Sequence, residues 1–305
     1  MAEKIILDNI ELILANPVNL DVNWIGQREI LEQLLACWLT VTETDRPLTP
    51  KIVGIPGVGK TTLAMAAAKI RKQELYIFQC TADTRPEDLI ITPVLNDQGK
   101  IAYHCSALAT AVIRGGICIL DEGNRMNEKS WASIAPLLDF RRYTESIITG
   151  LVLKAHQNFR CCITMNEDES TYQIPEYILS RLTPTLEIDF PDKQDELLIL
   201  KYHLPFAPDD LLNLTVEFLQ EAHSLKLDYS PRDGINIVRY ALKRIAQDKN
   251  NIYSNQEIWK EALIKTLGKD ALDLKKLSEQ KKINKGEYYS GLGLDDIFFD
   301  DDFKE

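Results

Sequence analysis

The sequence lacks several features that would place it in a specialised class of protein. Its 305 residues contain no uninterrupted apolar run of the roughly 18 residues that a membrane-spanning helix requires, so we expect no membrane association. The N-terminal stretch MAEKIILDNIELIL carries acids within its apolar part and has no small-residue cleavage site, which argues against a signal peptide. No internal repeat is visible. We therefore expect an ordinary globular protein with a cytoplasmic location.

Cysteine is infrequent and shows no Cys-x-x-Cys spacing. Several of the six cysteines lie in apolar, strand-like runs, which favours buried free thiols in a reducing compartment over disulfides or a metal site. The six are Cys37, Cys80, Cys105, Cys118, Cys161 and Cys162.

Positive charge is in the minority. The chain has 35 lysines and arginines against 46 acids, and its net charge of −11 argues against a protein whose main role is to coat nucleic acid. The charge is uneven near the end of the chain. Residues 265–285 hold seven lysines against three acids, whereas residues 295–305 hold six acids against one lysine.

The order of apolar runs predicts an α/β domain. Residues 24–39 have apolar side chains at helical spacing. ICIL and RCCITM are apolar without alternation, as strands covered on both faces are. Strands alternating with helices predict a parallel sheet sandwiched by helices. The predicted strands are KIVGI at 51–55, LYIFQC at 75–80, ICIL at 117–120, RCCITM at 160–165 and TLEIDF at 185–190.

Four parts of the chain are expected from this organisation. Two hairpin-like inserts, with turns at 97–99 and 149–150, interrupt the α/β part. After Pro191 the sequence predicts helices without strands, and one of these helices is NQEIWKEALIKTL at 255–267. We expect an N-terminal segment at 1–23, an α/β domain at 24–190, a smaller all-helical lid domain at 191–268 and a flexible tail at 269–305.

The stretch GIPGVGKTT, residues 54–62, has the pattern of a phosphate-binding loop. Gly54, Gly59, Lys60 and Thr61 fit G-x-x-x-x-G-K-[ST], and the loop lies between a predicted strand and a predicted helix. Its glycines let backbone N–H groups point at phosphate oxygens, while the lysine supplies positive charge and Thr61 offers a hydroxyl to Mg²⁺. The expected nucleotide-binding residues here are Gly54, Pro56, Gly57, Val58, Gly59, Lys60, Thr61 and Thr62.

A pair of acids follows the buried strand ICIL. Asp121 and Glu122 stand at its carboxyl end, where open α/β sheets bind their ligands. Asp121 is suited to hold Mg²⁺, together with Thr61, and Glu122 is suited to orient or deprotonate an attacking water. A dedicated water-activating acid implies hydrolysis rather than transfer to a metabolite. The alternative is a solvated acidic helix cap.

Three further polar residues are candidates for catalysis. Asn166 follows RCCITM and could position the water, although a lone asparagine is commonly a turn residue. Arg181 ends the predicted short helix before the last strand, where a surface ion pair is the alternative. Arg232 lies in the first turn of a predicted lid helix, where an arginine is poorly placed for the helix dipole unless an anion is nearby.

With these residues, the chain resembles an AAA+ ATPase of the MoxR type, including CbbQ/NorQ and dynein-related relatives, over roughly residues 20–268. GIPGVGKT resembles the Walker A motif and ICILDE resembles Walker B. DEGNR resembles the family's DEINR, with Gly123 in place of an apolar residue. Ser-Arg-Leu at 180–182 stands where the family has Asp-Arg-Phe, and no proline follows Asn166 closely.

The resemblance implies roles and partners. Asn166 would be sensor 1, Arg181 the arginine finger and Arg232 sensor 2, while Ile25 and Gly26 would border the adenine. It also implies ATP and Mg²⁺ as ligands, and a homo-oligomeric ring, expected to be a hexamer, because a finger arginine serves a neighbour's nucleotide. The ring would remodel or activate a protein client, in some relatives with a von Willebrand A-domain partner.

Other classes of function stay open at this point. One is a nucleic-acid motor or loader, against which stand the net charge and hairpins poor in lysine and arginine. Another is a nucleotide-dependent switch in a signalling or defence complex that does not turn over. A P-loop metabolite kinase is a third, although it would not be expected to carry a helical lid with an arginine in its first turn.

The acidic, aromatic end of the chain is a candidate docking motif. GLDDIFFDDDFKE sets one isoleucine and three phenylalanines among six acids, too few apolar groups to form a core. The aromatic side chains could fill apolar pockets of a partner while the acids contact a basic rim, and the alternative is a solubilising tail.

Overall fold

The computed structural model describes residues 3–19, 21–96, 99–166, 174–248 and 252–280. The chain divides into two compact units, which span residues 1–189 and 190–305. Among the described residues, no helix is both long enough and apolar enough to cross a membrane.

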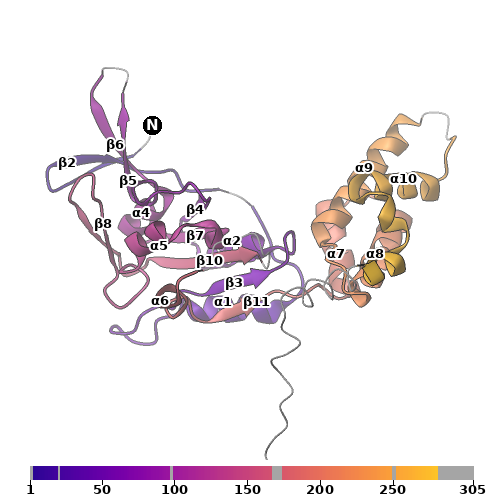
Figure 1. Ribbon diagram of the computed structural model, residues 1–305, viewed down its shortest axis with the longest axis horizontal. Helices are drawn as coiled ribbons and strands as arrows, with labels where there is room; N and C mark the ends of the chain where they lie inside the picture. Colours follow the sequence, from indigo (N-terminus) through magenta and orange to yellow (C-terminus); the bar gives the residue numbers. More distant parts are fainter. Residues whose placement is uncertain (1–2, 20, 97–98, 167–173, 249–251, 281–305) are drawn as a thin grey trace, which may run out of the picture. The chain divides into compact units, whose positions relative to one another are not determined.

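A five-stranded parallel sheet forms the centre of the first unit (Figure 1). The strand order is β11-β3-β10-β7-β4, so strands distant in sequence lie next to each other. The prediction of a parallel sheet is therefore confirmed. The strands are β3 (Lys51–Gly54), β4 (Leu75–Gln79), β7 (Ile117–Asp121), β10 (Arg160–Asn166) and β11 (Thr185–Glu187).

Helices cover both faces of this sheet, which explains the unalternated apolar strands. In β7, Ile117 and Ile119 join one buried cluster with the first two helices, whereas Cys118 and Leu120 join another with α4 and α5. Burial on both faces requires apolar residues at every position. The helices of this unit are α1 (Arg28–Cys37), α2 (Lys60–Arg71), α3 (Pro86–Leu89), α4 (Ala107–Arg114), η1 (Gly123–Arg125), α5 (Glu128–Ile134) and α6 (Glu176–Leu179).

A second sheet changes the interpretation of the N-terminus. Strands β1 (Lys4–Leu7) and β2 (Ile10–Ile13) form a hairpin, and β2 pairs in parallel with β6 (Ile101–Cys105), which pairs with β5 (Ile91–Leu95). The expectation of a separate N-terminal segment at 1–23 is corrected: its first strands belong to the α/β unit. The physical reason is that Leu12 and Leu14 are buried in the core around α4.

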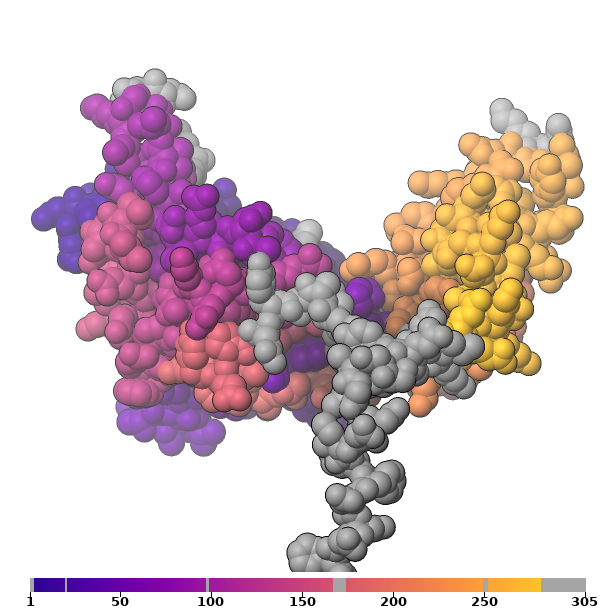
Figure 2. Space-filling model, in the orientation of Figure 1, coloured from indigo at the N-terminus to yellow at the C-terminus, as the bar shows by residue number. Residues whose placement is uncertain are grey.

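Both predicted hairpins are present. β5 and β6 pair antiparallel, and their hairpin extends away from the parallel sheet and protrudes from the first unit (Figures 1 and 2). Two residues of its expected turn, 97 and 98, lie outside the described residues. The second hairpin pairs β8 (Tyr143–Glu145) with β9 (Val152–Lys154), and Gly150 takes the left-handed φ of 69° in its turn.

The described part of the second unit is helical, with ends set by capping residues. Asp192 accepts hydrogen bonds from the N–H groups of Gln194 and Asp195, and capping boxes begin the third and fourth helices. The helices are α7 (Lys193–His203), α8 (Asp209–Ser224), α9 (Pro231–Gln247), α10 (Asn255–Leu267) and η2 (Lys269–Leu272).

The core of this unit continues past Gly268. Ala271 and Leu274 are buried in the same cluster as α8 and α10, and the Ser278 hydroxyl donates to the Leu225 carbonyl at 3.0 Å. The expected start of the flexible tail at residue 269 is therefore too early, because two apolar side chains beyond it fill the core. The acidic, aromatic motif at 293–305 lies outside the described residues.

All six cysteines are buried and free, so the prediction of buried free thiols is confirmed. Burial raises the pKa of each of these thiols, for example to about 11 for Cys37 and Cys105. A raised pKa keeps a thiol protonated and unreactive at neutral pH.

Candidate functional site

The carboxyl ends of four parallel strands bring the candidate residues to one edge of the sheet. Asn166, which ends β10, pairs in register with Gly54, which ends β3. Asp121, which ends β7, pairs with Gln79, which ends β4. The loop at 54–62 and the two acids after ICIL, far apart in sequence, therefore meet at the edge where parallel α/β sheets bind ligands.

The loop at 54–62 is tightly folded. Gly57 and Gly59 have left-handed φ values of 86° and 108°, which side-chain-bearing residues rarely adopt. A Cβ on Gly59 would also lie 3.1 Å from the ring of Trp24. The Lys60 ammonium donates to the carbonyls of Gly54 and Ile55 at 2.8 Å each, so its side chain folds back over the loop.

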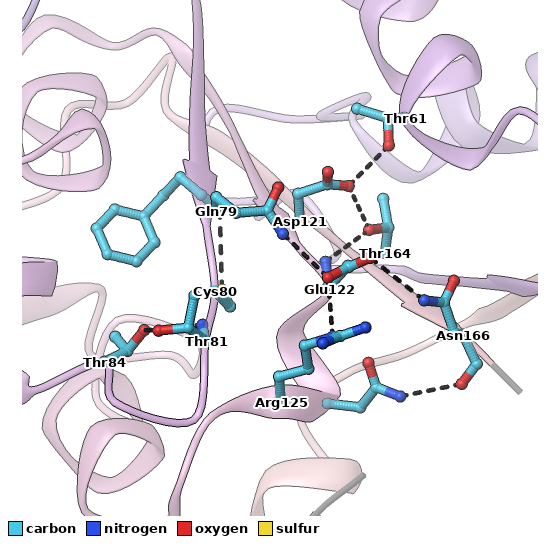
Figure 3. Close-up of polar contacts among 12 residues, drawn as sticks. Thr61, Gln79, Cys80, Thr81, Thr84, Asp121, Glu122, Arg125, Thr164 and Asn166 are labelled. Carbon is cyan, nitrogen blue, oxygen red and sulfur yellow. Dashed lines mark hydrogen bonds and ion pairs between the residues drawn. The ribbon is translucent and has the colours of Figure 1, made fainter. Parts of the chain in front are cut away.

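One carboxylate oxygen of Asp121 joins three elements (Figure 3). The Thr61 hydroxyl on α2 donates to it at 2.7 Å, and the Thr164 hydroxyl on β10 donates to the same oxygen at 2.6 Å. Thr164 also accepts from the backbone N–H of Glu122 at 3.0 Å. This threonine is buried and fixes both acids relative to the loop.

The Glu122 side chain is held by three neighbours (Figure 3). Its backbone adopts a left-handed φ of 55°, an uncommon conformation that is concentrated at functional sites. One carboxylate oxygen accepts from the Asn166 amide at 3.4 Å. The other accepts from the Gln79 amide at 3.1 Å and pairs with the Arg125 guanidinium at 2.8 Å.

The turn after Glu122 explains why glycine replaces the apolar residue of DEINR. A Cβ on Gly123 would lie 2.4 Å from the Cγ2 methyl of Ile163, a β-branched core residue of β10. The next residue, Asn124, is buried and donates to the carbonyl of Asn166 at 2.9 Å. The turn thus packs directly against the strand that ends in Asn166.

Arg181 lies apart from these acids within the described residues. Its guanidinium pairs with Asp139 at 3.2 Å, donates to the Tyr177 carbonyl and lies over the Tyr177 ring. Arg141, together with Arg181, lowers the pKa of Asp139 to about 2. Arg181 lines a cavity of about 300 Å³ with Arg46, Arg142 and other residues. The structure therefore does not bring Arg181 to the loop or to Glu122 of its own chain.

The remaining candidates lie in two places. Ile25 and Gly26 are half-buried just before α1, next to Trp24, whose ring N–H donates to the Gln27 carbonyl at 3.2 Å. Because Trp24 contacts Gly59, this segment borders the loop. Arg232 belongs to the second unit, where it is exposed in the first turn of α9.

Sequence reasoning missed four residues that shape the site: Thr164, Gln79, Arg125 and Trp24. Thr164 had a signal, since it is the one hydroxyl residue in the otherwise apolar interior of RCCITMN. Gln79 had a weaker one, as a polar residue at the end of a predicted strand. The contacts of Arg125 and Trp24 depend on turn geometry that the sequence does not reveal.

Comparisons with known proteins show what this chain is similar to. Residues 51–182 match the model of the AAA domain of the dynein-related subfamily. The denitrification regulatory protein NirQ of Pseudomonas aeruginosa is 30% identical over 154 residues, which are 48% of this chain and 56% of NirQ. The mouse von Willebrand factor A domain-containing protein 8 is 24% identical over 224 residues, 67% of this chain and 12% of that protein.

The fold also matches solved structures. The RuvB Holliday junction branch migration motor of Thermotoga maritima superposes with a TM-score of 0.54 at 16% identity, covering 81% of this chain and 71% of RuvB. This chain spans only about half of NirQ. The chain therefore has the fold of RuvB, and residues 51–182 are similar to the AAA domain of the dynein-related subfamily.

Proposed function

We propose that this chain is a MoxR-type AAA+ ATPase that hydrolyses ATP in a homo-oligomeric ring, expected to be a hexamer, and uses the energy to remodel a partner protein in the cytoplasm. The observation that carries the proposal is the shared oxygen of Asp121. The phosphate-loop hydroxyl of Thr61 and the strand hydroxyl of Thr164 both donate to it, and the candidate water-activating acid follows directly in the chain.

The residues at this edge fit Mg²⁺ and a nucleotide. A threonine hydroxyl and a carboxylate oxygen lie 2.7 Å apart, and both are oxygen donors of the kind that Mg²⁺ accepts. When bound, Mg²⁺ would neutralise phosphate charge. The backbone of residues 56–62 would hold the phosphates, Lys60 would turn from its carbonyls towards them, and Ile25 and Gly26 would border the base.

Hydrolysis would depend on Glu122 and Asn166. Glu122 accepts the proton of the attacking water, and Asn166, already 3.4 Å from its carboxylate, orients that water. The hydroxyl of Thr164 accepts a hydrogen bond from the backbone N–H of Glu122 and so keeps this backbone in place. Positioning of this kind is the main contribution a protein makes to phosphoryl transfer.

Arg181 would act on the nucleotide of a neighbouring subunit. Within its own chain Arg181 contacts Asp139 and Tyr177 and not Glu122, as expected for a residue that acts in trans. An arginine finger can be worth about 10³–10⁵ in rate. Arg232 would sense the γ-phosphate from the helical unit and convert hydrolysis into movement of that unit.

A protein client fits the exposed surface of the hairpins. The β5–β6 hairpin exposes Val94, Leu95 and Ile101, and the β8–β9 hairpin exposes Ile147 and Val152. Exposed aliphatic side chains of this kind favour contact with protein over contact with a phosphate backbone. The mouse relative is named for a von Willebrand A domain, so we propose a partner with such a domain for this chain.

Two substitutions test the proposal. Lys60→Ala should weaken ATP binding, whereas Glu122→Gln should keep binding and lose turnover, because it removes the base and leaves the loop intact. Binding is measured by calorimetry and turnover by phosphate release. Equal turnover of the wild type and Glu122→Gln would contradict the assignment of the base. Hydrolysis that is stimulated by DNA and lost at high salt would instead favour a nucleic-acid motor.

A further inference from the structure

The Glu122 carboxylate contacts more polar side chains than a water-activating acid requires. One of its oxygens pairs with the Arg125 guanidinium at 2.8 Å and also accepts from the Gln79 amide at 3.1 Å (Figure 3). A carboxylate oxygen occupied by two donors has less capacity to accept a proton or a hydrogen bond from a water. The arrangement therefore restrains the group that is proposed to start hydrolysis.

The turn that carries Arg125 is built to hold it beside this carboxylate. Gly123 packs against Ile163, and the buried Asn124 is anchored to the carbonyl of Asn166. The backbone N–H of Arg125 donates to the backbone carbonyl of Glu122 at 3.0 Å, and this hydrogen bond closes a tight 3₁₀ turn. Fixed on both sides, this turn places the arginine three residues after the acid, within ion-pair distance.

We propose that Arg125 is a positioning residue that restrains Glu122, so that hydrolysis requires the Arg125–Glu122 ion pair to open. This inference rests on the proposed hydrolysis and adds its regulation at the same site. The pair is partly open to solvent, with side-chain exposures of 46% for Arg125 and 32% for Glu122. Such a pair can open without unfolding the turn, since exposed ion pairs contribute little to stability.

The size of the effect follows from the strength of such pairs. An exposed pair contributes about 0.2–1 kcal/mol, which corresponds to an increase of about 1.4- to 5-fold in the population of free carboxylate. Arg125→Ala should therefore raise kcat by about this factor, with KM and nucleotide affinity unchanged. Arg125→Lys keeps the positive charge and should stay close to the wild-type rate.

Two controls separate restraint from a general structural effect. In the Glu122→Gln background, Arg125→Ala should have no effect on turnover, because no base is left to release. Lys4 forms an exposed ion pair with Glu11, also at 2.8 Å, and both residues are distant from Glu122 in the chain. Lys4→Ala removes that pair and should leave kcat unchanged. Thermal unfolding of each variant checks that the fold is retained.

The outcomes are distinguishable from failure of the proposed function. If the wild type hydrolyses ATP, Glu122→Gln does not, and Arg125→Ala is equal to or slower than the wild type, the restraint is wrong while hydrolysis stands. A wild type that hydrolyses ATP and an Arg125→Ala chain that hydrolyses it about 1.4- to 5-fold faster support the restraint. Inactivity of both chains overturns the restraint together with the proposed hydrolysis.

Discussion

At the scale of residues, the site is organised around one buried hydroxyl. Thr164 donates to Asp121 and accepts from the backbone of Glu122, so a single side chain fixes the two acids to the strand that ends in Asn166. Both contacts are made from a side chain that is 1% exposed. A buried hydroxyl with both of its roles used is costly to replace.

Thr164→Val is expected to weaken both stability and turnover. Valine has the same shape but leaves the Glu122 N–H unpaired and removes one donor from Asp121, which should cost about 1–3 kcal/mol of unfolding free energy. Turnover should fall because the backbone N–H of Glu122 loses the hydroxyl that fixes its position. Urea denaturation and phosphate release measure the two effects. Thr164→Ser keeps the hydroxyl, so an equal loss in that variant would show that the methyl group, not the contacts, matters.

The sequence identified those candidate site residues that can be recognised from their immediate neighbours in the chain. The loop at 54–62, Asp121, Glu122 and Asn166 are recognisable because each follows a short apolar strand, and the structure brings them to one edge of the sheet. The contact of Gln79 with Glu122 depends on where β4 lies beside β7, and the contact of Arg125 depends on the geometry of the turn after Glu122, so neither contact was predictable. Strand order is set by long-range packing, which a linear pattern does not encode.

At the scale of elements, the strands of the parallel sheet and the helices of the second unit were predicted within a few residues, whereas α3, α4 and α5 were not predicted. The segment at 255–267 was predicted as a helix and is α10 with the same bounds, because its capping box and apolar spacing are local signals. The N-terminal strands were missed. β1 and β2 have four residues each, and their place in a sheet depends on pairing with β6, about ninety positions further along the chain.

The helical unit contains a buried acid that should make its stability depend on pH. Glu196 on α7 is fully buried and accepts from Gln220 at 2.7 Å, and burial raises its pKa from 4.5 to about 7. The folded state therefore keeps a proton that the unfolded chain loses above pH 4.5. Stability should fall as the pH rises from about 5 to 7, by about 3 kcal/mol at most, and level off above that.

Glu196→Gln isolates this effect. Glutamine has the same shape and still accepts from Gln220, but it does not titrate, so this part of the pH dependence should disappear. Burial lowers the pKa values of His203 and His223 in the same unit, and these groups titrate in both chains. Hydrogen exchange of α7 and α8 between pH 5 and 8 gives the comparison. Parallel curves for the two chains would contradict the assignment.

At the scale of the whole molecule, the proposed ring requires that catalytic parts come from different subunits. Arg181 lines a separate cavity and pairs with Asp139, so no contact among the described residues links it to Asp121 or Glu122 of its own chain. A chain that lacks Arg181 should still bind nucleotide, since Lys60, Thr61 and Asp121 are intact. Arg181→Ala should therefore bind ATP almost normally and hydrolyse it poorly.

Mixed assemblies test whether the arginine acts in trans. Lys60→Ala subunits cannot hold nucleotide well but retain Arg181, while Arg181→Ala subunits hold nucleotide but lack the finger. In a mixture, some interfaces combine an intact loop with an intact arginine, so phosphate release should rise above that of either variant alone. The rise should depend on the mixing ratio and peak at intermediate compositions. A mixture that stays inactive, although the subunits exchange, would mean that Arg181 acts within its own chain, where its contacts with Asp139 and Tyr177 leave it a structural role.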